Sequence, residues 1–82
     1  MKHSDFRMGM EFTTNNGNRI WRVTDIGTRT IIAIRIDHVV MSTGKSIDGA
    51  EAEETGWFKG PPYAVQEFVF DEDDLPTCEL VK

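Results

Sequence analysis

The residues of this chain that could take part in acid–base, metal or thiol chemistry are few and scattered. Two histidines, His3 and His38, and one cysteine, Cys78, are spread along the sequence. Structural zinc sites need three or four ligands at short spacings such as Cys-x2-Cys, which this sequence lacks. His38 follows Asp37, but adjacent residues of a β-strand point to opposite faces, so no acid–base pair is predicted there. We therefore predict no metal site, no cofactor and no catalytic residue, and expect that the protein is not an enzyme.

Four consecutive acidic residues at positions 71–74 form the densest group of oxygen ligands. Hard cations such as Ca²⁺ prefer oxygen ligands, but the EF-hand loop requires glycine at its sixth position and glutamate at its twelfth. Counted from Asp71, these positions are Pro76 and Lys82. The run instead predicts a solvated turn, in which Asp71 opens a short 3₁₀ helix and Leu75 folds back onto the core.

Aromatic and proline side chains gather in one short segment. The group consists of Trp57, Phe58, Pro61, Pro62 and Tyr63. Aromatic rings beside prolines are typical of grooves that bind partner proteins. The same side chains could equally close one end of a small domain whose own core is thin. Both interpretations stay open at the level of sequence.

A second candidate surface is basic. It consists of Arg19, Trp21, Arg22, Arg29 and Arg35, a mixture of arginine and aromatic residues that is typical of nucleic-acid-binding strands. The chain has a net charge of −5 and a pI near 4.8, which disfavours a polyanionic partner. This charge is an average over two unlike parts, because residues 1–47 carry seven basic and four acidic side chains, whereas residues 48–82 carry two basic and ten acidic ones. A local basic face is therefore possible.

The elements that position these side chains are mainly β-strands. Phe6, Met8, Met10 and Phe12 alternate with polar residues or glycine, which predicts a half-buried strand. Asn-Gly in the following segment 14–18 predicts a hairpin, since a tight hairpin turn needs residues that tolerate positive φ. Residues 19–26 are predicted to be the second strand, with Trp21 and Val23 on one face.

The rest of the chain contains a long β-rich run and then a segment without a strong pattern. Residues 28–40 are rich in β-branched side chains and predict a long central strand that is covered on both faces. Residues 42–62 are predicted to be a long loop, with one helical turn capped by Asp48 and ended at Gly56. Residues 63–70 resume as a strand, and residues 79–81 could add an edge strand.

These elements predict one mainly β domain over residues 1–82. A small antiparallel SH3-like barrel of four to five strands, with the long loop at 42–62, is the favoured architecture, and an OB-type barrel is the alternative. No apolar run approaches the roughly 20 residues that span a bilayer. A single cysteine fits a reducing compartment, so a cytoplasmic location and no membrane association are expected.

Two motifs resemble a family of small bacterial proteins to which no activity is assigned. Residues 24–30 fit a TD-x-GTRT strand motif, and residues 60–75 fit a GPPYAV-x-E-x-VFDE-x-DL motif. The resemblance implies a bacterial, cytoplasmic protein that exists as a free-standing small chain. It transfers no functional residue, and segment 42–55 is longer here than in the similar proteins.

The function predicted from these observations is that of a binding or regulatory module. We expect a protein partner at the surface formed by Trp57, Phe58 and Tyr63 with the neighbouring prolines. Nucleic-acid binding through the basic strands is the alternative. The sequence gives neither the identity of the partner nor the oligomeric state.

Overall fold

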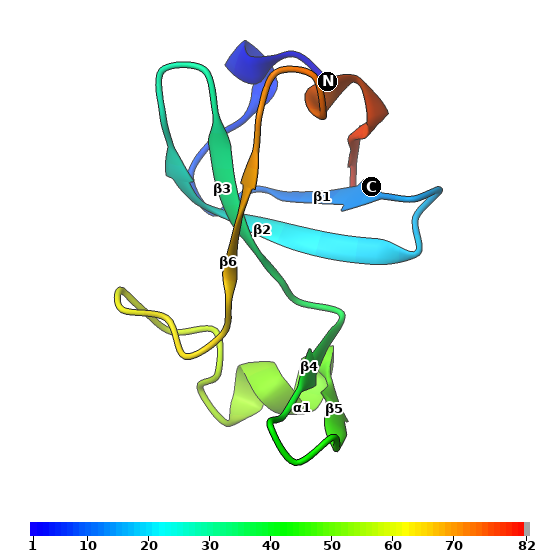
Figure 1. The fold of residues 1–82 in the computed structure, drawn as a ribbon, viewed down its shortest axis with the longest axis vertical. Helices are drawn as coiled ribbons and strands as arrows, with labels where there is room; N and C mark the ends of the chain where they lie inside the picture. Colours follow the sequence, from blue (N-terminus) through cyan, green and yellow to red (C-terminus); the bar gives the residue numbers. More distant parts are fainter. Residues whose placement is uncertain (82) are drawn as a thin grey trace.

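The computed structural model describes residues 1–81 and has a mainly β architecture (Figure 1). Five antiparallel strands form one sheet in the order β6-β3-β2-β1-β7, and two more form a small separate sheet, β4-β5. The strands are β1 (Glu11–Thr14), β2 (Arg19–Ile26), β3 (Ile31–Arg35), β4 (His38–Val40), β5 (Ser46–Asp48), β6 (Glu67–Phe70) and β7 (Glu79–Leu80). The helices are η1 (His3–Asp5), α1 (Gly49–Glu54) and η2 (Leu75–Thr77).

The predicted hairpin connects β1 and β2. Thr14 and Arg19 are paired across it, so residues 15–18 form the turn. Asn15, Asn16 and Gly17 have φ values of 56°, 59° and 86°. Asparagine and glycine are the residues that tolerate this left-handed region best, which is why the sequence signal was reliable.

The first strand is shorter than predicted, because it begins at Glu11 rather than near Phe6. A turn at Gly9, with φ of 78°, separates the preceding residues from β1. Phe6 and Phe12 are both buried, with their rings 5.2 Å apart, whereas Met8 is exposed. Phe6 and Phe12 therefore enter the core from two separate segments, and the alternating apolar pattern does not come from a single strand.

The predicted strand over 28–40 is divided by a bend at Ile36 and Asp37. β3 stays in the large sheet, and β4 turns away to pair with β5 (Figure 1). The Asp37 side chain and carbonyl hold this bend, since they accept hydrogen bonds from Arg35 and from the backbone N–H of Gly49. β-propensity gives no information about such a bend, because it depends on partners distant in sequence.

The segment 42–62 contains regular structure where a loop was predicted. It includes β5 and α1, and the predicted helical turn is confirmed within it. The Asp48 carboxylate accepts a hydrogen bond from the Glu51 N–H at 2.8 Å, and Gly56, with φ of 84°, follows the end of the helix. β4, β5 and α1 together form a compact unit, here called the β4–α1 unit.

Two groups of buried side chains lie on the two faces of β3, which confirms that it is covered on both sides. The main core contains Phe6, Phe12, Trp21, Val23, Ile31, Ala33, Leu75 and Cys78. The second core contains Ile34, Val39, Ala52 and Phe58, with Ile36, Ile47, Trp57, Tyr63 and Val65 packed around it. The second core joins the β4–α1 unit to the sheet.

The large sheet is open in the described part of the chain, so a closed SH3-like or OB-type barrel is not confirmed. β6 and β7 occupy its two edges and do not pair with each other. The predicted edge strand near the C-terminus is present as β7, and Leu75 of η2 is buried as expected. Among residues 1–81 there is no helix with the length and apolarity to cross a bilayer.

Candidate binding groove

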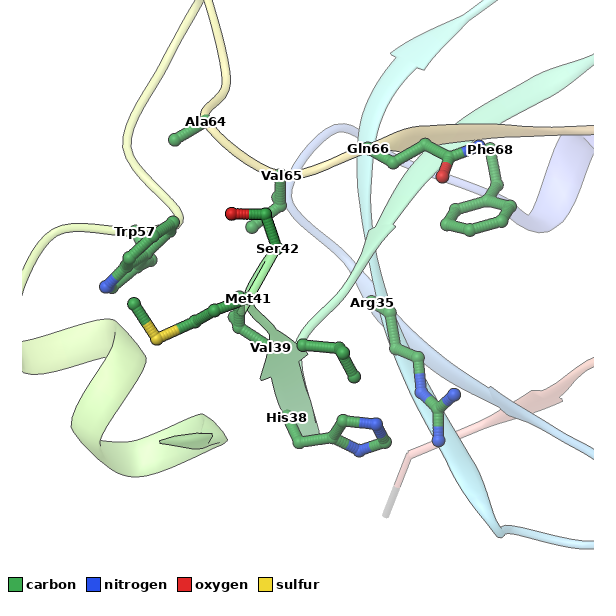
Figure 2. A pocket seen from close by; sticks show the side chains of 11 residues that line it. Arg35, His38, Val39, Met41, Ser42, Trp57, Ala64, Val65, Gln66 and Phe68 are labelled. Carbon is green, nitrogen blue, oxygen red and sulfur yellow. The ribbon is translucent and has the colours of Figure 1, made fainter. Parts of the chain in front are cut away.

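A groove of about 480 Å³ lies between the large sheet and the β4–α1 unit (Figure 2). Its lining is largely apolar and comes from four segments of the chain. The lining residues are Arg35, His38, Val39, Val40, Met41, Ser42, Trp57, Ala64, Val65, Gln66 and Phe68. Its volume is in the range of sites that bind small molecules or peptide side chains.

One wall of the groove is β4 with the two residues that follow it. Val39 is buried in the second core, whereas its neighbour Val40 is 64% exposed, because successive strand residues point in opposite directions. A turn closes the β4–β5 hairpin, with the Met41 N–H bonded to the Lys45 carbonyl at 2.7 Å. β4 pairs only with β5 in the part of the chain that is described, so its second edge is unpaired.

The opposite wall is formed by residues 64–68, which lead into β6. Phe68 packs edge-on against Trp21 at a ring distance of 5.1 Å, yet it remains 38% exposed. Val65 is half-buried against the second core. Both walls are therefore anchored in the second core, through Val39 and Val65, and Phe68 also contacts Trp21 of the main core.

Only one of the five predicted partner-binding residues lines the groove. This residue is Trp57, which is half-buried, and in Figure 2 the sulfur end of Met41 points towards it. Phe58 is buried in the second core, and Tyr63 is partly buried against it. Pro61 and Pro62 are exposed and lie outside the groove lining. The segment thus combines the two interpretations that the sequence left open, since one ring lines a surface and its neighbours fill a core.

Sequence reasoning missed the other apolar lining residues. Val40, Met41, Val65 and Phe68 belong to runs that were assigned as strand or loop. Val40 and Met41 lie at the end of the β-rich run. The available sequence signal was that these apolar side chains had no predicted partner strand to cover them. Phe68 and Val65 lie on a predicted strand, and their exposure depends on how the β4–α1 unit is placed.

Arg35 and His38 lie at the end of the groove opposite Trp57 (Figure 2), and both contact the Asp37 carboxylate. Arg35 donates to both carboxylate oxygens of Asp37, at 2.6 and 2.8 Å. Nδ1 of His38 lies 3.2 Å from Oδ2 of Asp37. Burial is the largest single influence on the pKa of Asp37 and would raise it. The hydrogen bonds from Arg35 and from backbone N–H groups, with the positive charge of Arg35, together outweigh burial and hold this pKa below its usual value.

The contact between Asp37 and His38 corrects the sequence-based expectation that adjacent side chains diverge. That rule holds within a regular strand, but Asp37 lies in the bend that precedes β4. The contact orients Nδ1 towards the carboxylate and leaves the other ring nitrogen for a ligand. The group can bind and orient polar atoms at the groove end.

The five residues of the predicted basic surface do not share one exposed face. Trp21 is buried in the main core, and its Nε1 donates to Thr14 Oγ1 at 2.9 Å. Arg22 is paired opposite Ile34 and Arg35 opposite Trp21, so the two arginines lie on opposite faces of the sheet. Within residues 1–81, three of the four arginines form ion pairs, namely Arg22 with Glu11 and Glu53, Arg29 with Glu72, and Arg35 with Asp37. Arg19 is exposed at the start of β2.

The cysteine, the other histidine and the acidic run are each buried in the core or hydrogen-bonded within the fold. Cys78 is buried in the main core, and burial raises the pKa of its thiol. His3 Nε2 donates to the Gly27 carbonyl at 2.8 Å. In the acidic run, Asp71 and Asp74 accept hydrogen bonds from the N–H groups of Asp73 and Asp71. Residues 1–81 contain no group of three or more side chains placed to hold a metal ion.

Comparison with known proteins gives no further guide to the site. No family model, curated protein or solved structure matches this chain. The resemblance of segments 24–30 and 60–75 to small bacterial proteins therefore stays a prediction. Any functional interpretation must come from the groove itself.

Proposed function

We propose that this protein is a non-enzymatic binding module that holds an extended segment of a partner protein in the groove. The observation that carries the proposal is the exposure of apolar side chains along that groove. Trp57, Val40 and Phe68 present apolar surface there, although each belongs to a segment that also packs into a core. Exposed apolar surface in a concave site is typical of protein-interaction sites.

The shape of the groove supports a protein segment as its ligand. Its two walls each contain a strand, β4 in 38–42 and the start of β6 in 64–68, so the groove lies between two chain segments. An extended peptide fits between such walls and can place alternate side chains in apolar positions. The aromatic ring of Trp57 would then act as the anchor, because aromatic residues dominate many interfaces.

We also propose that the large sheet is an SH3-like barrel left open along one side. The last strand β7 pairs with the first strand β1, beside the β1-β2-β3 meander, and the two edges that full closure would have to join are β6 and β7. The β4–α1 unit would be an insertion between the third and fourth barrel strands. We further propose that the protein is bacterial and lies in the cytoplasm.

Selection from a displayed random-peptide library tests the proposed function. The immobilised protein should enrich peptides with apolar residues, and these peptides should bind less well to the variants Val40→Ser and Trp57→Ala. Val40 is largely exposed, so its replacement is expected to leave folding intact. Trp57 contacts the second core, so its variant is compared at matched folded fraction.

Met8→Ser provides the matched control, since Met8 is 62% exposed and lies outside the groove lining. This variant should bind the selected peptides as the unaltered protein does. The proposal is wrong if no peptide is enriched, or if the groove variants bind as well as Met8→Ser.

A further inference from the structure

β6 offers an unpaired strand edge that continues from the groove. It is the outermost strand on its side of the large sheet, and it pairs only with β3 among the described residues. Glu67, Phe68 and Val69 are exposed, and Val69 reaches 65%. Alternate residues of an antiparallel edge strand direct their N–H and C=O groups away from the sheet. Such an edge is a template for an additional strand.

The two ends of β6 differ in charge. Its C-terminal end leads directly into the acidic residues 71–74. All four are exposed, and in the described part of the chain only Glu72 forms an ion pair with an arginine. Its N-terminal end leads back to the groove, where Arg35 and His38 lie. In Figure 1 the chain that leads into β6 from the groove and the acidic turn that follows β6 lie on opposite sides of the strand. Arg35 and His38 both contact the Asp37 carboxylate, so a bound segment would meet acidic groups at one end and the largely apolar groove at the other.

We propose that the partner segment binds as an added strand along β6, with basic residues beside 71–74 and apolar residues in the groove. Antiparallel pairing is slightly more stable than parallel pairing, and it places the N-terminal end of the segment beside the acidic turn. The expected ligand is thus an extended segment with lysine or arginine at its N-terminal end and alternating apolar residues after it. This inference rests on the proposed function and names its ligand class.

A second copy of this chain fits the same edge poorly. An antiparallel pair of β6 strands would bring Glu67 of each copy next to residues 71–74 of the other. Carboxylates placed opposite one another destabilise a strand pair. Charge complementarity therefore favours a basic segment from a different protein.

Synthetic peptides test strand addition without altering the protein. The parent peptide is acetylated, amidated and fluorescently labelled, and carries two lysines followed by alternating valine and threonine. Two further peptides are N-methylated at alternate residues. In the first peptide the methyl groups lie on one edge of the peptide strand, and in the second they lie on the other edge. Only one edge can pair with β6, so one methylated peptide should lose binding about tenfold or more and the other should bind like the parent.

Two charge-reversal variants test the orientation of the peptide. Asp73→Lys alters the acidic turn at a side chain for which the structure gives no hydrogen bond, and Glu79→Lys makes the same charge change on the opposite edge of the sheet. At low ionic strength Asp73→Lys should lower the affinity for the parent peptide about three- to tenfold. Glu79→Lys should change this affinity less than about twofold. A reversed peptide, with the lysines at its C-terminal end, should bind less well than the parent.

The outcomes separate this inference from the proposed function. If both methylated peptides bind like the parent while Val40→Ser weakens binding, the groove is a binding site and strand addition is wrong. If Asp73→Lys and Glu79→Lys have equal effects, the basic end of the ligand is wrong. If the parent peptide does not bind while library peptides still bind in the groove, the proposed ligand class of a basic, strand-forming segment is wrong and the proposed function stands. Absence of binding by both kinds of peptide overturns the proposed function too.

Discussion

Arg22 on β2 and Glu53 on α1 are joined by two hydrogen bonds, at 2.8 and 3.3 Å, although 31 positions separate them in the sequence. The same guanidinium donates to Glu11 on β1 and lies 6.0 Å from the centre of the Phe58 ring. The pKa of Glu53 is held below its usual value by the hydrogen bonds from Arg22. Arg22 therefore links the sheet to the β4–α1 unit above the second core.

Glu53→Gln is expected to lower the free energy of unfolding by about 0.5–1 kcal/mol, since the ion pair is partly exposed to solvent. The loss should shrink at high salt. Glu54→Gln on the same helix is the control, because no ion pair involves Glu54 in the described residues. Urea unfolding of both variants measures the difference, and equal effects would show that the Arg22–Glu53 pair does not stabilise the fold.

Stability should fall at acid pH because Asp37 and Glu53 have lowered pKa values in the folded state. A carboxyl group of this kind stabilises the fold above its unfolded-state pKa, and this contribution is lost as the pH falls through the folded-state pKa. The loss is therefore expected below about pH 4. Asp37→Asn should lower stability at neutral pH by about 1–3 kcal/mol and flatten the acid dependence.

Urea unfolding at a series of pH values checks this expectation, with Asp73→Asn as the control. Asp73 is exposed and is not part of the group around Arg35. An Asp37→Asn variant that loses stability in acid as steeply as the unaltered protein would contradict the role assigned to this carboxylate.

Gly49→Ala should be strongly destabilising. Gly49 opens α1, and a Cβ atom there would collide with the carbonyl oxygen of Ile36 in the bend between β3 and β4. The backbone must shift to relieve this overlap, at a cost of about 1–3 kcal/mol. Thermal unfolding compares this variant with Ala50→Ser, which alters the exposed neighbouring position and should unfold near the unaltered protein. A Gly49→Ala variant as stable as Ala50→Ser would refute the close approach.

The two tryptophans should respond differently to a water-soluble quencher. Trp21 is only 4% exposed, whereas Trp57 is half-buried at the groove. Iodide should therefore quench the fluorescence of Trp21→Phe, which retains Trp57, more strongly than that of Trp57→Phe. The selected peptides should protect Trp57 from quenching. Equal quenching of the two variants would mean that Trp57 does not face an accessible groove.

The arginines are expected to give no strong site for nucleic acid. Trp21 is buried, Arg22 and Arg35 lie on opposite faces of the sheet, and both are paired with carboxylates. A labelled single-stranded oligonucleotide at low ionic strength should show no saturable binding. Saturable binding that weakens in Arg19→Glu but not in Glu79→Lys would support the nucleic-acid alternative instead.

The local features of this protein were predictable because their causes are local. The turn at 15–18 follows from asparagine and glycine, and the cap of α1 follows from the reach of the Asp48 side chain to the N–H of Glu51. β-branched residues predicted β3, and apolar residues on both of its faces predicted a central strand, which is buried on both sides in the structure. These signals depend on residues a few positions apart, so a single sequence contains them.

Only the tertiary structure decided where the groove lies and which side chains line it. The bend at Asp37 depends on Arg35 and Gly49, and the position of the β4–α1 unit depends on Arg22 meeting Glu53. The sequence by itself determined a mainly β domain, its hairpin and a group of aromatic residues near position 60. The division of these aromatic residues between core and surface was set by packing, because burial is determined by contacts between segments that are far apart along the chain.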